Sequence, residues 1–301
     1  MTGAPAVLAI VGPTGTGKTE LACELARRIG GEVIGADSMQ VYRRMDIGTA
    51  KPPRSLRDEI PHHAIDLVEP DDPMSAGRYA AVARRAAVEI HARGGRAILC
   101  GGTGLYARAF ARGLIGGVAS DALLRARLEA RSTEELCALL AARDPESARR
   151  IEPQDRVRMI RALEVTELGG APSSEQRDAH GFRDRPFEVR WLGLRSEREV
   201  HWSRLQERTQ RMFQEGLVDE VRELRRAGFS PSLRALNAIG YREAGQFLDG
   251  HIDEAQARES TWIATRRYAK RQLTWFRGEP GISWLDAERP GRAVEEALHR
   301  A

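Results

Sequence analysis

One segment constrains the fold of this chain more than any other: Gly12-Pro13-Thr14-Gly15-Thr16-Gly17-Lys18-Thr19. It matches the phosphate-binding pattern G-x-x-x-x-G-K-[ST] at every fixed position. An apolar run of strand length precedes it at 6–11, and residues 20–28 have the apolar spacing of a helix. In this setting backbone N–H groups and a helix N-terminus bind linked phosphates, with Lys18 at the terminal phosphates and the Thr19 hydroxyl on Mg²⁺. The loop alone does not identify the phosphorylated ligand.

The composition fits one large α/β domain with an insertion, or two domains. The chain has 301 residues, of which 42% are hydrophobic and 30% charged, enough for a packed core. No apolar run approaches the roughly 20 residues of a membrane span, and the first five residues lack the features of a signal peptide. We therefore expect a cytoplasmic protein. The three cysteines Cys23, Cys100 and Cys137 match no zinc pattern, and we expect all three to be buried.

Strand and helix patterns alternate over the first 115 residues, which predicts a parallel sheet. The expected elements after the loop are strands at 32–37, 63–68 and 96–100 and a helix at 76–93. In such sheets ligands bind at the carboxyl ends of the strands. We therefore expect Asp37 and Thr103 to lie beside the phosphate loop.

From about 120 to 169 the pattern changes to helices only, with leucines at helical spacing. A polar stretch follows at 169–185, and strand character returns at 189–194 and 282–285. We predict an α/β fold: a P-loop NTPase-like parallel sheet core flanked by helices, formed by 1–119 and 186–301. An all-helical insertion domain occupies 120–185.

Asp37 has three interpretations from the sequence. It orders Mg²⁺ in an ATPase, it accepts a proton from a nucleophile as a general base, or it caps a helix or loop. Asp66, at the end of another expected strand, competes for the first role. In the segment Gly101-Gly102-Thr103-Gly104, the glycines permit close approach to a ligand and Thr103 offers a hydroxyl, but a simple turn explains the segment equally well.

The segment from Trp262 to Gly278 carries five basic residues and no acid. Two i,i+4 pairs gather this charge on one face of the expected helix, and the aromatic side chains between them favour core anchors over base-stacking platforms. With the arginines at 156, 158 and 161 of the insertion, the helix predicts basic surfaces for nucleic-acid phosphates. A solvated charged face is the alternative.

Taken together, these segments resemble the tRNA dimethylallyltransferase family, the bacterial tRNA isopentenyltransferases, nearly from end to end. The resemblance rests on GPTGTGKT at 12–19, ADSMQVY at 36–42, MDIGTAKP at 45–52, GGTGLY at 101–106, RALEV at 161–165, GYRE at 240–243 and KRQLTWFR at 270–277. Arg44 stands where the family often has Gly, and Thr16 where it often has Ser. Neither departure removes a functional group that the chemistry needs.

The resemblance implies that the phosphate loop, residues Gly12 to Thr19, holds dimethylallyl diphosphate instead of ATP. The dimethylallyl group then passes to N6 of the adenosine 3′-adjacent to the anticodon (position 37) in tRNAs that read codons beginning with U. The products are N6-isopentenyladenosine and diphosphate, and Mg²⁺ is the implied cofactor, with Thr19 as its ligand. The implied catalytic residues are Asp37 as proton acceptor, Thr103 as a positioning group, and Lys18 and Arg242 on the diphosphate.

The resemblance also implies that the insertion and the basic C-terminal helix clamp the anticodon stem-loop. The residues it assigns to tRNA are Asp37, Ser38, Met39, Gln40, Thr103, Arg125, Gln154, Asp155, Arg156, Val157, Arg158, Gly240, Tyr241, Arg242, Lys270, Arg271, Gln272 and Arg277. We expect a monomer that binds tRNA and dimethylallyl diphosphate and no membrane. Three alternatives stay open: an ATP-dependent kinase or NTPase, an adenylate isopentenyltransferase, and a non-enzymatic RNA-binding module.

Overall fold

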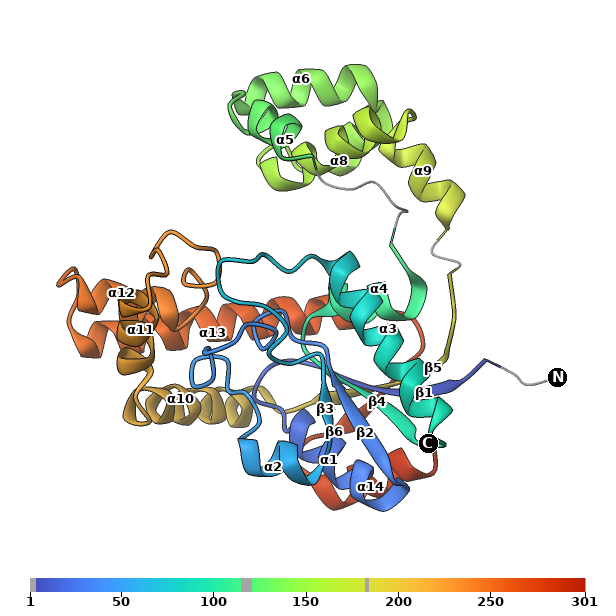
Figure 1. Cartoon of the computed structure of the whole chain (residues 1–301), viewed down its shortest axis with the longest axis vertical. Helices are drawn as coiled ribbons and strands as arrows, with labels where there is room; N and C mark the ends of the chain where they lie inside the picture. The colour runs from blue at the N-terminus through green and yellow to red at the C-terminus, as the bar shows by residue number, and fades with distance from the viewer. Residues whose placement is uncertain (1–3, 115–120, 182–183, 301) are drawn as a thin grey trace. The chain divides into compact units, whose positions relative to one another are not determined.

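A parallel β-sheet forms the centre of the larger part of the molecule in the computed structural model, which describes residues 4–114, 121–181 and 184–300 (Figure 1). Its six strands are β1 (Ala6–Val11), β2 (Gly31–Gly35), β3 (His62–His63), β4 (Arg96–Gly101), β5 (Glu188–Arg195) and β6 (Ile282–Asp286). They lie in the order β3-β2-β4-β1-β5-β6, and every neighbouring pair is parallel. This confirms the predicted α/β class.

Helices cover both faces of the sheet, as the nearly continuous apolar strands require. Along β1, Val7 and Ala9 belong to one apolar cluster, and Leu8 and Ile10 belong to the other. The helices of this part are α1 (Lys18–Ile29), α2 (Arg54–Glu59), α3 (Ala76–Ala92), α4 (Gly104–Arg112), α10 (Arg198–Gln214), α11 (Leu217–Arg226), α12 (Tyr241–Leu248), α13 (Glu254–Arg277) and α14 (Pro290–Leu298). Helices α1 and α14 pack on one face, and α3, α4 and α10 to α13 contribute to the cluster on the other (Figure 1).

The phosphate loop joins β1 to α1 in the strand–loop–helix order expected from the sequence. Gly12, Gly15 and Gly17 have φ angles of 143°, 78° and 80°, which side chains rarely tolerate. A Cβ at Gly12 would also lie 2.6 Å from the Leu194 carbonyl oxygen of β5. The loop therefore keeps its conformation only with glycine at these positions.

The expected strand at 63–68 is wrong beyond its first residue. Strand β3 ends at His63, and Ala64 and Asp66 have φ angles of 60° and 53°, which strands do not contain. The backbone N–H of Asp66 donates to the carbonyl of Gln40. This segment therefore packs against the loop that follows β2 and does not extend the sheet.

Residues 112–185 form a separate unit, and all the secondary structure of its described residues is helical. Its helices are α5 (Ala122–Glu129), α6 (Thr133–Arg143), α7 (Pro145–Arg150), α8 (Arg156–Gly169) and α9 (Ser173–His180), around a core that includes Leu124, Leu136 and Leu163. The sequence analysis placed the insertion at 120–185, and its first boundary lies outside the described residues. Helix α9 occupies part of the stretch that the sequence marks only as polar.

Within the three described ranges, no helix combines the length and apolar character needed to cross a bilayer. The three cysteines are free thiols. Burial raises the pKa of Cys100 to about 12, so its thiol stays protonated. Cys137 is only half-buried, which corrects the expectation that all three are buried.

Candidate active site

The phosphate loop is held by its own side chains and by two distant helices. Inside the loop, the Thr16 hydroxyl and the Lys18 ammonium both donate to the Pro13 carbonyl, at 2.9 and 2.6 Å. From outside, Gln272 of α13 accepts the Thr14 N–H at 2.8 Å, and His201 of α10 bonds the Thr14 carbonyl at 2.7 Å. These bonds fix the loop before any phosphate arrives.

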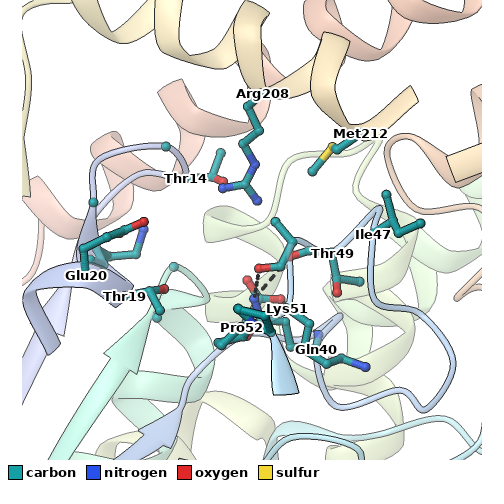
Figure 2. Close-up of a pocket in the computed structure, with 18 of the residues that line it drawn as sticks. Thr14, Thr19, Glu20, Gln40, Ile47, Thr49, Lys51, Pro52, Arg208 and Met212 are labelled. Carbon is teal, nitrogen blue, oxygen red and sulfur yellow. Dashed lines mark hydrogen bonds between the residues drawn. The ribbon is translucent and has the colours of Figure 1, made fainter. Parts of the chain in front are cut away.

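The loop forms one side of a cavity of about 720 Å³ (Figure 2). Thr14, Lys18 and Thr19 line it from the loop. Helix α10 supplies Arg204, Arg208 and Arg211 and the apolar Met212, and the loop at 46–53 supplies another wall. The cavity thus combines phosphate donors and cationic groups with an apolar region.

A second, smaller cavity of about 260 Å³ adjoins the first, and the two share Thr14, Asp37, Thr49, Arg208 and Met212 as lining residues. Its remaining walls come from α10, α12, α13, the segment before α12 and the chain that follows β2. Asp37 therefore lies where the two cavities meet, which is the place for a group that acts between two bound reactants.

The carboxylate of Asp37 is oriented by its own loop. Its Oδ1 atom accepts the backbone N–H of Met39 at 2.8 Å and that of Gln40 at 3.4 Å. One oxygen of this carboxylate therefore caps the loop, as one of the three sequence interpretations states. Such a cap also fixes the direction of the other oxygen, so the capping and general-base interpretations are compatible.

Thr103, between β4 and α4, fixes the same loop. Its hydroxyl accepts the Ser38 N–H at 2.9 Å and donates to the Ser38 hydroxyl at 3.3 Å. Its own N–H donates to the Ala36 carbonyl at 3.0 Å. Burial is the main cause that raises the pKa of Tyr268 to about 12. The hydrogen bonds of its hydroxyl with Thr103 and Gln272 act in the opposite direction and lower this pKa. Thr103 therefore belongs to a buried polar network beside Asp37.

Two cationic groups of the cavity carry perturbed pKa values. Burial, together with the nearby Arg208 guanidinium, lowers the pKa of Lys18 to about 8, and Cys100, Asp37 and Glu20 oppose this shift. Burial also lowers the pKa of Arg208, whereas Asp37 and Glu20 raise it. Positive charge is costly in this cavity until an anion compensates for it.

Sequence reasoning missed Arg208. The sequence contained a signal for it, because Arg204, Arg208 and Arg211 recur at helical spacing. The structure shows that all three line one cavity. Arg242, which the resemblance places on the diphosphate, is not among the residues that line either cavity. Its Nε instead donates to Glu243 at 3.0 Å.

Asp66 is committed to two cations. It accepts from Lys51 at 2.6 Å and from Arg57 at 2.7 Å. This pairing removes it from competition with Asp37 for a metal-ordering role. In the part of the chain that the structure describes, no three His, Cys, Asp or Glu residues gather closely enough to hold a metal ion by themselves.

The residues that the resemblance assigns to tRNA fall into two groups in the larger unit. Lys270, Arg271 and Arg277 are exposed on α13. Gln272 and Tyr241, by contrast, are buried at 5% and 1% exposure, and their polar groups bond inside the protein. These two side chains act as internal braces in this structure.

The same division occurs in the helical unit. Gln154, Val157 and Arg158 are exposed. Arg125 forms a bidentate pair with the fully buried Glu164, at 2.9 and 2.6 Å. Arg156 donates to backbone carbonyls, and Asp155 caps α8 through the Arg158 N–H.

The geometry agrees with comparisons to known proteins. A family model described as IPP transferase matches residues 40–279, and one described as Isopentenyl transferase matches 5–61. The tRNA dimethylallyltransferase of Geobacter sulfurreducens is 49% identical over 92% of this chain and 90% of its own. The tRNA dimethylallyltransferase 2 of Syntrophus aciditrophicus is 46% identical over 97% and 94%. The chain belongs to the tRNA dimethylallyltransferase family. The resemblance inferred from the sequence motifs is thereby confirmed.

Solved structures agree with this membership. The tRNA delta(2)-isopentenylpyrophosphate transferase of Staphylococcus epidermidis aligns with a TM-score of 0.72 at 34% identity, over 98% of each chain. A eukaryotic dimethylallyltransferase acting on tRNA aligns with a TM-score of 0.85 at 29% identity, over 99% of this chain and 77% of that one. The P-loop-like core of the tRNA dimethylallyltransferase family is therefore the framework of the site described above.

The lowered pKa of Lys18 predicts a pH-dependent affinity for a phosphate ligand of this loop. A bound anion raises this pKa, so the favourable interaction is fully present below about pH 8, weakens above it, and is lost as the pH rises through the higher pKa of the bound state. We expect the affinity for dimethylallyl diphosphate, measured by calorimetry, to fall by up to about tenfold per pH unit above about pH 8.

Lys18→Arg is the matched control, because a guanidinium stays charged over this range. Its affinity is expected to be flat where that of the wild type declines. An equal decline in both proteins would assign the titration to the ligand or to another group.

Proposed function

We propose that this protein transfers the dimethylallyl group of dimethylallyl diphosphate to N6 of the adenosine 3′-adjacent to the anticodon in tRNAs that read codons beginning with U. One observation carries the proposal: Asp37 lines both the cavity of the phosphate loop and the smaller cavity beside it. In our proposal the larger cavity takes the diphosphate and the smaller one takes the adenine, which must leave its stack to enter.

The transfer breaks the allylic C–O bond and forms a C–N bond at N6, and the N6 proton passes to the Asp37 carboxylate. Negative charge develops on the departing diphosphate. We assign the stabilisation of this charge to the N–H groups of the phosphate loop, the Lys18 ammonium and the Arg208 guanidinium; Lys18 and Arg208 line the larger cavity. Because these groups are fixed before binding, little reorganisation accompanies the reaction.

Mg²⁺ fits this donor set as part of the proposal. Thr19, Glu20 and Asp37 all line the larger cavity, and Mg²⁺ is usually held by few protein ligands, substrate phosphates and water. We assign the Thr19 hydroxyl as its protein ligand. When bound, the ion supplies electrostatic stabilisation of the leaving diphosphate.

The proposed tRNA interface uses the exposed residues of the assigned set. On α13 these are Lys270, Arg271 and Arg277, whose charges suit the phosphates of the anticodon stem-loop. In the helical unit, Arg158 offers a further cation and Val157, at 76% exposure, an apolar contact. We further propose that the protein acts in the cytoplasm as a monomer.

Prenyl transfer is the first outcome to measure. With labelled dimethylallyl diphosphate and Mg²⁺, we expect label to enter unmodified tRNA and not AMP. Transfer only to AMP would assign the protein to free nucleotides, and turnover of ATP without tRNA would favour the kinase or NTPase alternative.

Asp37→Asn removes the proposed proton acceptor but keeps the shape of the side chain. General-base catalysis contributes about 10²–10⁴-fold, so we expect transfer to fall by that factor while the dissociation constant for tRNA stays within about threefold. Filter binding and single-turnover transfer measure the two quantities. Undiminished transfer would remove Asp37 from the reaction.

The two arginines assigned to the diphosphate, one by the structure and one by the resemblance, can be compared directly. Arg208→Gln is expected to weaken binding of inorganic diphosphate by about tenfold or more, because it removes a charged partner from the cavity. Arg242→Gln is expected to change that affinity by less than about twofold. The reverse order would support the assignment made from the resemblance.

A further inference from the structure

The loop at 42–52, between β2 and α2, is held in an unusual conformation where it lines the larger cavity. Arg44 and Ala50 have φ angles of 63° and 45°, which cost free energy for residues other than glycine. Ile47, Thr49 and Ala50 of this loop line the cavity. A strained wall persists only where neighbouring groups fix it, and two charged side chains do so here.

Glu220 of α11 fixes the middle of the loop. Its carboxylate accepts three successive backbone N–H groups, those of Asp46 and Ile47 at 2.8 Å and of Gly48 at 3.2 Å. It also accepts the hydroxyl of the buried Tyr241 at 2.5 Å. A carboxylate bound by three backbone N–H groups forms charge-assisted hydrogen bonds, the strong kind.

The ring of Tyr241 closes this arrangement. A Cβ at Gly48 would lie 2.3 Å from the Tyr241 ring, so the loop backbone and α12 are in direct contact. Tyr241 also lines the smaller cavity. A shift of the loop would therefore change the walls of both cavities.

Lys51 fixes the end of the loop. Its side chain is only 1% exposed, and its ammonium donates to the Tyr42 carbonyl at 2.9 Å, to Asp46 at 2.5 Å and to Asp66 at 2.6 Å. The Gln40 amide adds bonds of 3.2 Å to the carbonyls of Thr49 and Ala50. The loop is thus bound at both ends and in the middle.

The fixed loop faces the apolar end of the cavity. Figure 2 shows Ile47 and Met212 together, away from Thr19 and Glu20, which lie by the phosphate loop. Phosphate donors and the allyl chain need opposite surroundings, so the diphosphate belongs at the first end and the five-carbon chain at the second.

We propose that Glu220 and Lys51 are positioning residues that hold the 42–52 loop as the wall of the allyl site, and so limit the length of the prenyl chain that the site accepts. This inference rests on the proposed prenyl transfer. Neither residue touches the reacting atoms; they act through Ile47 and its neighbours.

Glu220→Gln tests the proposal, because it places an NH₂ donor against backbone N–H donors. We expect the dissociation constant for dimethylallyl diphosphate to rise about tenfold and that for inorganic diphosphate to stay within about twofold, by calorimetry. In transfer assays, discrimination against geranyl diphosphate should fall about tenfold. Glu223→Gln is the control, since Glu223 lies on the same helix, is 67% exposed and pairs with Arg226.

Equal weakening of both ligands would indicate general destabilisation and overturn the proposal, as would unchanged values for both. If Glu220→Gln does not fold, Tyr241→Phe replaces it, because it removes the hydroxyl that Glu220 accepts. The ratio of the dissociation constant for dimethylallyl diphosphate to that for inorganic diphosphate is then expected to rise about threefold. The absence of prenyl transfer in the wild type would count against the proposed function, and the ligand comparison would still test the wall.

Discussion

The backbone of Thr14 is the point on which the site depends. Its N–H is bound by Gln272 of α13 and its carbonyl by His201 of α10, and the Gln272 amide continues to the Gly102 carbonyl at 2.8 Å. One glutamine therefore joins the phosphate loop, the loop after β4 and the helix that carries the exposed cations. A change in the position of α13 would reach the phosphate loop through the buried Gln272 side chain.

The electrostatics of the cavity follow from this rigidity. Lys18 and Arg208 are enclosed before any anion is present, and burial lowers the pKa of both. The folded protein bears the cost of desolvating these cations in advance, and a bound diphosphate offsets it. Cations that are fixed before binding stabilise most strongly the state that carries the most negative charge beside them. In prenyl transfer this is the transition state, in which negative charge develops on the departing diphosphate.

Local patterns in the sequence predict the elements that local interactions determine. The loop at 12–19 and its flanking strand and helix follow from spacing and glycine positions alone. The segment 63–68 has the apolar content of a strand, but Asp66 is held by Lys51 and Arg57, which lie in a loop and a short helix before it. Glu220 was missed for a related reason, because its backbone partners are more than 170 residues away.

The motifs assigned to tRNA by the resemblance contain both exposed and buried residues, and the structure distinguishes the two. In KRQLTWFR at 270–277, Lys270 and Arg271 face solvent while Gln272 faces the phosphate loop. In GYRE at 240–243, the buried Tyr241 bonds Glu220, and Glu243 accepts both the Gly240 N–H and the Arg242 guanidinium. A run of neighbouring residues on a helix points in several directions, so contact with RNA cannot be a property of the whole run. In the proposed tRNA interface the exposed members form the surface, and the buried members set the position of that surface relative to the cavity.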